Sequence, residues 1–147
     1  MEFVRFKHAR FSARLPVAFR YSLSHYWMVE DVPGLWRVGF TKFATRMLGE
    51  LVEARYEVAV GDQVSSGQTI GHVEGFKAAS DLFCVMDGGF AGGNPLLDED
   101  ACLVKSSPYE DGWLYAVEGE PEETSVDVHG YVAHLEALIE KMQSEGY

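Results

Sequence analysis

The sequence predicts a mostly β protein, a small barrel or sandwich with one short internal helix and one C-terminal helix. Residues 50–117 alternate short apolar runs with turns rich in Gly and Asp, and many short strands at this spacing are typical of such folds. Residues 126–144 repeat apolar side chains at intervals of three and four, which is the period of an amphipathic helix. The 147 residues are enough for one domain with its own core.

Composition and charge exclude several classes of function. Apolar residues make up 47% of the chain and charged residues 24%, which is ordinary for a folded protein. The formal net charge is −11, so the chain repels phosphate backbones and nucleic acid is not an expected partner. The sequence contains no apolar run long enough to cross a membrane and no secretory h-region. Its two cysteines have no metal-ligand spacing, which favours a reduced, cytoplasmic setting and no metal site.

The first twenty residues differ from the rest in charge. They carry five basic side chains against Glu2 alone, and these are Arg5, Lys7, Arg10, Arg14 and Arg20. We expect residues 1–20 to be a basic N-terminal extension with one edge strand over 3–15 that ends at Pro16. A basic segment that docks on the acidic body of the chain, or on a partner, is the alternative. The main domain is then expected over 21–121 and a helical segment over 122–147.

The elements of the main domain follow from turn and periodicity signals. Two strands are predicted over 21–30 and 35–40, because the Asp-Val-Pro-Gly sequence between them is typical of a turn. Thr41 is expected to cap a short helix that stops at Gly49. Strands over 51–60, 68–74 and 79–86 come next, and the glycine-rich segment 87–95 is expected to form turns. The C-terminal helix is expected to pack on the β-core, with docking on a partner as the alternative.

One lysine stands out because of the residues around it. Two turns containing Gly61 and Gly67 precede a strand-like run, and Lys77 then falls in the tight turn that follows. The residues after it are small and polar, so the lysine is expected to project from the tip of a hairpin. From these features alone, a plain solvated lysine is the alternative to a modified one.

The chain resembles the glycine cleavage system H proteins, and more broadly the lipoyl carriers, over roughly residues 21–121. The matching segments are Tyr-Ser-Leu-Ser-His-Tyr-Trp at 21–27, Val-Gly-Phe-Thr at 38–41, Leu-Gly at 48–49, Gly-Asp-x-Val-x-x-Gly-Gln at 61–68, Val-Glu-x-x-Lys-Ala-x-Ser-Asp at 73–81 and Pro-Tyr-Glu-Asp-Gly-Trp-Leu at 108–114. Each match alone is weak, but their order and spacing make the resemblance specific. It implies the barrel-sandwich hybrid fold of lipoyl and biotinyl carriers.

The resemblance also implies a cofactor, a site and partners. Lys77 would carry lipoate through an amide bond, with Glu74 and Asp81 flanking it and Glu74 helping the lipoate-attaching enzyme to recognise the hairpin. If these carboxylates have no such role, they only keep the hairpin soluble. Biotin is disfavoured, because biotin carriers place a methionine on each side of the lysine. The chain would not be an enzyme, and its other partners would be glycine decarboxylase, aminomethyltransferase and dihydrolipoyl dehydrogenase.

Some residues depart from the family pattern. Tyr26 occupies the position of a glutamate that belongs to the surface where the loaded arm rests, and the usual Glu-Ser-Val-Lys is Glu-Gly-Phe-Lys at 74–77. Because a phenol is neutral at pH 7, Tyr26 predicts weaker holding of an aminomethyl group. Two alternatives therefore stay open. One is a lipoate-binding carrier of a heterodisulfide-reductase-like sulfur oxidation system, and the other is an unlipoylated binding module.

Overall fold

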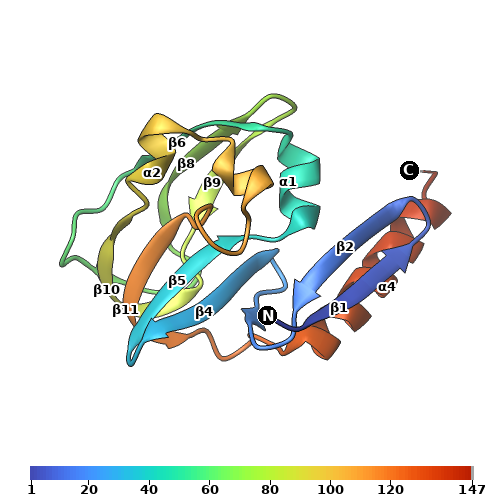
Figure 1. The fold of residues 1–147 in the computed structure, drawn as a ribbon, viewed down its shortest axis with the longest axis horizontal. Coiled ribbons are helices and arrows are strands. Elements are labelled where there is room, and N and C mark those ends of the chain that lie inside the picture. The colour runs from blue at the N-terminus through green and yellow to red at the C-terminus, as the bar shows by residue number, and fades with distance from the viewer. Residues whose placement is uncertain (147) are drawn as a thin grey trace.

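The computed structural model describes residues 1–146. Figure 1 shows a β-rich body on one side and, beside it, a β-hairpin that lies along the C-terminal helix. The elements in chain order are β1 (Phe3–His8), β2 (Phe11–Pro16), β3 (Arg20–Tyr21), β4 (Tyr26–Val32), β5 (Leu35–Phe40), α1 (Lys42–Leu48), β6 (Leu51–Tyr56), β7 (Gln63–Val64), β8 (Thr69–Gly75), β9 (Ala79–Phe83), β10 (Met86–Gly93), α2 (Leu96–Glu99), α3 (Leu103–Ser106), β11 (Tyr115–Pro121) and α4 (Val128–Ser144).

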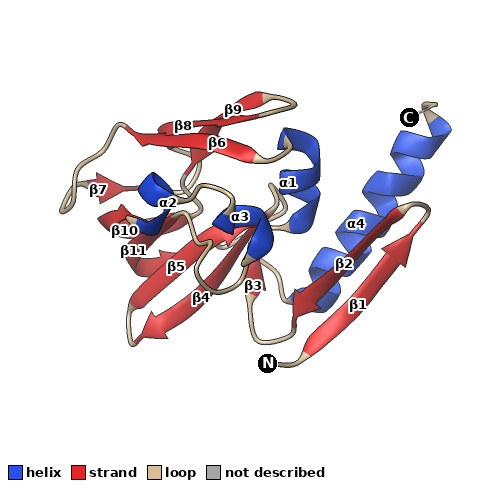
Figure 2. Cartoon of the chain, turned by 45° about the horizontal axis from the view of Figure 1, so that its top comes forward, coloured by secondary structure: helices blue, strands red, loops and turns tan. Residues whose placement is uncertain are grey.

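Two sheets form the β-rich body. The larger has six strands in the order β3-β4-β5-β11-β10-β7, and the smaller has the order β6-β8-β9. Figure 2 shows the smaller sheet stacked over the larger one. Ile70, Val73 and Leu82 of the small sheet share one buried apolar cluster with Val38 and Val117 of the large sheet. This arrangement confirms the mostly β, sandwich-like fold with a short internal helix and a C-terminal helix.

The N-terminal segment folds as a hairpin of two strands, whereas one edge strand was expected. β1 and β2 pair with each other in a sheet of their own, with His8 opposite Phe11. The turn between them includes Ala9 at φ 53°, a left-handed conformation that is uncommon for alanine. No Gly or Pro marks this turn in the sequence, and for that reason the segment resembled one strand.

Helix α4 and the β1–β2 hairpin build a second apolar cluster. Phe6, Phe11 and Leu15 of the hairpin are buried with Leu135 and Ile139 of α4. The edge of the large sheet joins this cluster, because the rings of Tyr21 and Tyr131 stack with centroids 4.9 Å apart. The core between the two main sheets is thus built without α4, which covers the hairpin and the β3 edge.

The glycine-rich segment after β9 is a strand, and the turns expected there are wrong. β10 pairs with β11 along its whole length, with Gly88 opposite Gly119. A Cβ atom on Gly88 would lie 2.0 Å from the carbonyl oxygen of Glu118, and one on Gly93 would lie 2.4 Å from the ring of Tyr56. Glycine is therefore needed here for close packing, not for a change of chain direction.

The two ends of helix α1 contact different parts of the molecule: its N-cap residue contacts α4, and its C-terminal end contacts the β8–β9 hairpin. Thr41 is its N-cap residue, but the hydroxyl makes no capping bond and instead lies 2.7 Å from the hydroxyl of Tyr131. Gly49 ends the helix at φ 77°, and its N–H donates to the carbonyl oxygen of Thr45. Among residues 1–146, no helix has the combination of length and apolar character needed to cross a membrane.

Candidate functional site

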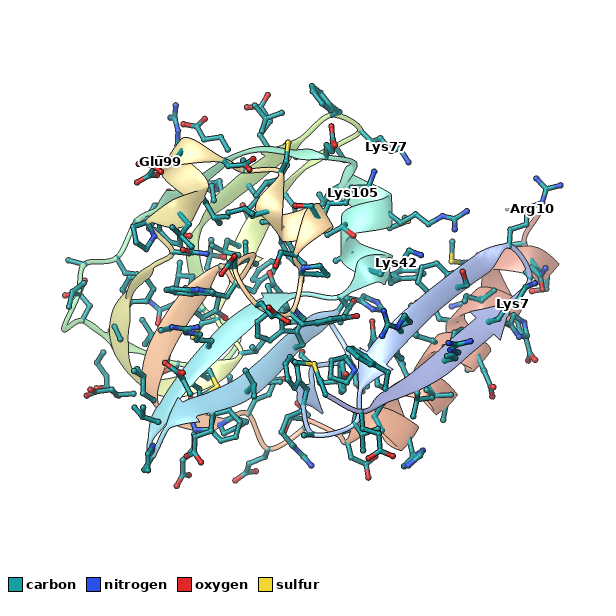
Figure 3. All side chains as sticks on the ribbon, in the orientation of Figure 1. Lys7, Arg10, Lys42, Lys77, Glu99 and Lys105 are labelled. Carbon is teal, nitrogen blue, oxygen red and sulfur yellow. The ribbon has the colours of Figure 1, made fainter. Side chains whose placement is uncertain are left out.

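Lys77 lies at the tip of the β8–β9 hairpin. The strands pair Glu74 with Ala79 and His72 with Asp81, and the turn closes with a 2.9 Å hydrogen bond from the Gly75 N–H to the Ala78 carbonyl oxygen. The Lys77 side chain is exposed, and Figure 3 shows it projecting from the tip of the hairpin. The position expected from the sequence is therefore the one observed.

The backbone of this tip is clamped to the connection between α1 and β6. The N–H of Phe76 donates to the carbonyl oxygen of Glu50 at 3.0 Å, and the N–H of Lys77 donates to that of Leu48 at 2.9 Å. Gly75 makes this approach possible, because a Cβ there would lie 2.2 Å from the same Leu48 oxygen. Position 75 is serine in the usual family pattern and glycine here. In this chain, a side chain at that position would collide with the Leu48 carbonyl oxygen.

The Lys77 amine is held far less firmly than its backbone. Its Nζ donates a single 3.2 Å hydrogen bond to the exposed carbonyl oxygen of Arg46, and within residues 1–146 it forms no ion pair. A fixed backbone with a free, accessible amine suits covalent attachment of a long arm. The residues around the amine therefore fit an amide-linked group such as lipoate.

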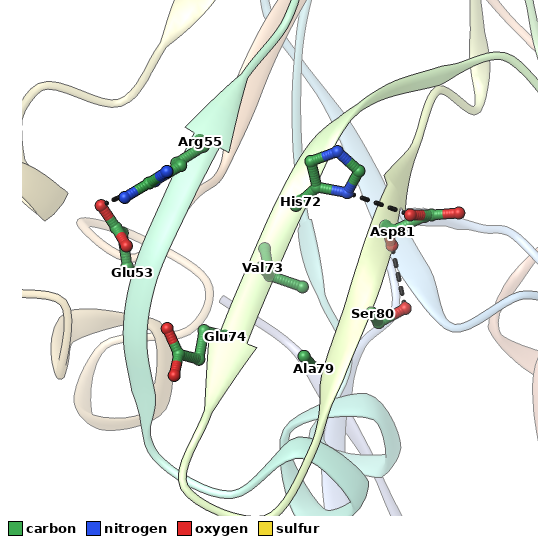
Figure 4. A pocket seen from close by; sticks show the side chains of 8 residues that line it. All are labelled: Glu53, Arg55, His72, Val73, Glu74, Ala79, Ser80 and Asp81. Carbon is green, nitrogen blue, oxygen red and sulfur yellow. Dashed lines mark hydrogen bonds and ion pairs between the residues drawn. The ribbon is translucent and has the colours of Figure 1, made fainter.

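Glu74 and Asp81 both lie on the exposed face of the hairpin, but their environments differ. Asp81 lies 3.0 Å from Nδ1 of His72, whose Nε2 lies 2.7 Å from Glu57. For Glu74, no side-chain hydrogen bond or ion pair is found in the described part of the chain. The two carboxylates line a hollow of about 610 Å³. Figure 4 shows them on the neighbouring strands β8 and β9.

His72 is a feature of this site that the sequence did not reveal. It lies between two carboxylates, and its hydrogen bond to Glu57, followed by the charge of Glu57 and the contacts with Asp81, raises its pKa. The three residues come from β8, β9 and the segment after β6, so only the strand register brings them together. In its protonated form, His72 partly neutralises Asp81, whereas Glu74 has no such partner among the described residues.

Tyr26 does not lie on a surface where an arm could rest. Its exposed fraction is 3%, and its hydroxyl accepts a 3.0 Å hydrogen bond from the backbone N–H of Phe83 in β9. The ring packs on Phe40, and burial raises the pKa of the phenol to about 12. The expectation that position 26 belongs to the surface where the loaded arm rests is wrong for this chain. The ring is packed in the core, and the hydroxyl is hydrogen-bonded to the backbone of β9.

The two cysteines have different surroundings. Cys84 is buried, donates to the carbonyl oxygen of Met86 at 3.1 Å, and has a thiol pKa raised to about 11 by burial. Such a thiol is a poor nucleophile. Cys102 is exposed. Neither cysteine lies at the hairpin tip.

An accessible lysine on a clamped hairpin tip, carried by a small β-sandwich, defines the class of carriers that present a covalently attached arm. The family model described as "Glycine cleavage H-protein" matches residues 19–143. The chain therefore belongs to the glycine cleavage H-protein family, whose members are lipoyl carriers with lipoate bound covalently to a lysine.

Individual relatives agree with this assignment. The glycine cleavage system H protein of Micrococcus luteus is 37% identical over 124 residues, which cover 82% of this chain and 96% of that protein. The H protein of an Enterobacter species is 33% identical over 127 residues, covering 84% and 98%. The crystal structure of the H protein from Mycobacterium marinum matches with a TM-score of 0.73 at 29% identity, covering 82% of this chain and 98% of that one.

Proposed function

We propose that Lys77 is the lysine that carries lipoate in this lipoyl carrier. The observation that carries the proposal is the contrast between a clamped backbone and an accessible amine at the hairpin tip. An amide bond to lipoate would remove the charge of the amine without disturbing the backbone hydrogen bonds that hold the tip. Neighbouring lysines such as Lys42 and Lys105 sit on helices and have no such hairpin around them.

The arm would move a bound group between enzymes and leave the reaction itself to the cofactor. The dithiolane of lipoate supplies the group-transfer chemistry when it is attached. This chain contributes a fixed origin for the arm and raises the effective concentration of the bound group at each partner enzyme. In this proposal no side chain acts as a nucleophile or a general acid, so the chain is not an enzyme.

The proposed partners follow from the family and from the face that carries the hairpin. A lipoate-attaching enzyme would recognise Glu74, which has no partner among residues 1–146, more strongly than Asp81, which is hydrogen-bonded to His72. Glycine decarboxylase, aminomethyltransferase and dihydrolipoyl dehydrogenase would then meet the lipoylated arm. We place these encounters in the reduced cytoplasm, a setting that suits two cysteines left as free thiols.

Mass spectrometry of the intact protein tests the proposal. Chain produced with lipoate and a lipoate ligase should gain one lipoyl group, and Lys77→Arg should gain none. Lys105→Arg is the matched control, because Lys105 is also exposed but lies on α3, and this variant should be modified normally. Modification that persists in Lys77→Arg would refute the assignment, and an unmodified lysine in protein isolated from the native host would favour the unlipoylated binding module.

A second candidate is a lipoyl carrier of a sulfur oxidation system, and one observation favours it. A groove rich in basic side chains lies beside the hairpin tip, and its charge suits a negatively charged group on the arm better than an ammonium.

A further inference from the structure

A groove of about 1090 Å³ lies beside the hairpin tip, and Lys77 is part of its lining. Its walls come from four parts of the molecule: the β1–β2 hairpin, helix α1 with Gly49 and Glu50, the hairpin tip at 76–77, and residues 104–109. Figure 3 shows Lys77 and Lys105 near α1, Lys42 at the start of α1, and Lys7 on the β1–β2 hairpin. Residues 1–18 lie outside the region that matches the family model, so one wall comes from a segment outside that match.

The groove is strongly basic in a protein that is acidic as a whole. Its cationic lining residues, Lys77 aside, are Arg5, Lys7, Arg14, Lys42, Arg46 and Lys105, and Glu50 is the one acidic side chain among the described lining residues. None of the six cations forms an ion pair within residues 1–146. The net charge of the whole chain is −11. Unpaired cations on facing walls repel one another, so an occupant with negative charge is favoured.

Apart from Ser12 and Thr45, the rest of the lining is apolar. Phe3, Phe76, Pro108 and Tyr109 contribute to it, whereas Phe6 and Val104 are largely buried beneath it. Phe76 lies next to Lys77 and is 77% exposed, so an apolar occupant would cover a ring that water now surrounds. An apolar surface edged by cations fits a hydrocarbon chain that ends in an anion.

The geometry of Lys77 identifies the occupant as the arm itself. The Lys77 Nζ already lies 3.2 Å from the carbonyl oxygen of Arg46, a residue that lines the groove. An arm attached to this nitrogen starts at the groove wall, and its hydrocarbon chain can lie along the apolar lining. Lipoylation would also remove the charge of Lys77, but the six other cations would remain.

We propose that this groove holds the lipoyl arm when one of its sulfur atoms carries a negatively charged group. The ammonium of an aminomethyl group would be repelled, and an arm that carries it would stay outside. The chain would thus accept an anionic cargo in addition to the one that its family name implies. This inference rests on the proposed lipoylation of Lys77.

The test compares three arms whose end groups are similar in size and differ in charge. Lipoylated Cys102→Ser protein, which lacks the exposed thiol, is reduced and its arm alkylated with iodoacetate, iodoacetamide or 2-bromoethylamine. Each reagent replaces the thiol hydrogens, halide and a proton leave, and the arm ends in carboxylates, neutral amides or ammonium groups. We expect the carboxymethyl arm alone to shift the backbone amide NMR signals of β1, β2 and α1. The shifts should fade from about 0.01 M to about 1 M salt, as the Debye length falls from about 30 to about 3 Å.

Charge reversal on one wall provides the matched variants. Lys42 and Arg46 are exposed and four residues apart on α1, so Lys42→Glu with Arg46→Glu changes the groove and not the core. The bound-to-free ratio of the carboxymethyl arm should fall at least about tenfold. Lys141→Glu, on an exposed position of α4 outside the groove, should leave that ratio unchanged. Lys42→Gln with Arg46→Gln gives a smaller loss and serves if the reversed variant does not fold.

The outcomes separate this inference from the proposed function. If intact mass shows no lipoyl group on Lys77, both are overturned. If Lys77 is lipoylated but the three arms give equal shifts, or none enters the groove, only the inference is overturned. Binding of an oligoglutamate peptide to unmodified Lys77→Arg protein, with no arm in the groove, would assign the groove to an acidic partner and would also overturn it.

Discussion

The backbone N–H of Lys77 donates a 2.9 Å hydrogen bond to the carbonyl oxygen of Leu48, the last residue of α1. This bond joins two segments that lie far apart in the sequence, and the N–H of Ala78 donates to the same oxygen at 3.3 Å. Because the tip is fixed here, the orientation of the arm is set by the end of a helix and not by the hairpin alone.

Gly75→Ala should destabilise the protein and slow its lipoylation. The added Cβ would lie 2.2 Å from the Leu48 carbonyl oxygen, so the tip must move away and its hydrogen bonds must lengthen. We expect a loss of about 1–3 kcal/mol in the free energy of unfolding, measured by urea denaturation. Gly89→Ala is the control, because nothing lies within 4 Å of a Cβ there. Equal stability and modification rates in both variants would contradict a tight clamp.

Glu74→Ala should slow lipoylation without changing stability. The carboxylate is exposed and lacks a partner in the described residues, so its removal should alter the free energy of unfolding by no more than about 0.5 kcal/mol. The initial rate of modification by the ligase is the measurement. Glu118→Ala, at an exposed position of β11, should be modified at the normal rate. If Glu74→Ala loses stability but keeps its rate, the residue is structural.

His72 should titrate at a higher pH than an ordinary histidine. The carboxylates of Glu57 and Asp81 favour the protonated ring, with the Glu57 hydrogen bond as the largest cause. A raised folded-state pKa means that the stabilisation is fully present below about pH 6.5 and is lost as the pH rises through the folded-state pKa. In an NMR titration, Glu57→Gln should lower the His72 pKa more than Asp81→Asn does, and Glu53→Gln should not lower it.

Substitutions at Tyr26 should change the free energy of unfolding, because the side chain is part of the core and not of a surface that holds the arm. Tyr26→Phe removes the acceptor for the Phe83 N–H and should cost about 1 kcal/mol of unfolding free energy. Tyr26→Glu buries a carboxylate and should cost at least about 3 kcal/mol. Improved activity with glycine decarboxylase is therefore not expected from Tyr26→Glu, although glutamate is the residue that the family pattern places here. A stable Tyr26→Glu protein would contradict the burial of this side chain.

The sequence predicted the parts of the fold that local patterns encode. The turns at Gly61 and Gly67 and the apolar alternation near Ile70 and Val73 were sufficient to place Lys77 on a hairpin. Local patterns misled where glycine serves packing between strands, as in β10, and where alanine takes a turn conformation, as at Ala9. In both cases the deciding contact or dihedral angle has no signal in the neighbouring residues.

The groove could not have been predicted in the same way. Its lining comes from residues 3–14, 42–50, 76–77 and 104–109, and only the folded chain brings these four segments together. The sequence did mark residues 1–20 as basic, with docking on the body of the chain as one alternative. The structure adds that the basic side chains of β1 and β2 face further cations from α1 and α3 across the groove.

His25 should affect stability with a pH dependence opposite to that of His72. Burial, followed by the charge of His134, lowers the pKa of His25 to about 4. Its ring stacks on Phe43, and its Nδ1 lies 2.8 Å from the hydroxyl of Tyr131. Because the folded-state pKa lies below the unfolded value of about 6.5, the unfolded chain takes up a proton first as the pH falls. Stability should therefore decrease from about pH 7 toward pH 4.

His25→Asn isolates this contribution. Asparagine tolerates the backbone conformation at this position, where φ is 75°, and it does not titrate. The free energy of unfolding of the unsubstituted protein should fall by about 1–3 kcal/mol more than that of His25→Asn between pH 7 and pH 4, since each pKa unit corresponds to about 1.36 kcal/mol. Urea denaturation at several pH values measures the difference. Parallel pH profiles for the two proteins would mean that His25 stays accessible to protons in the folded state.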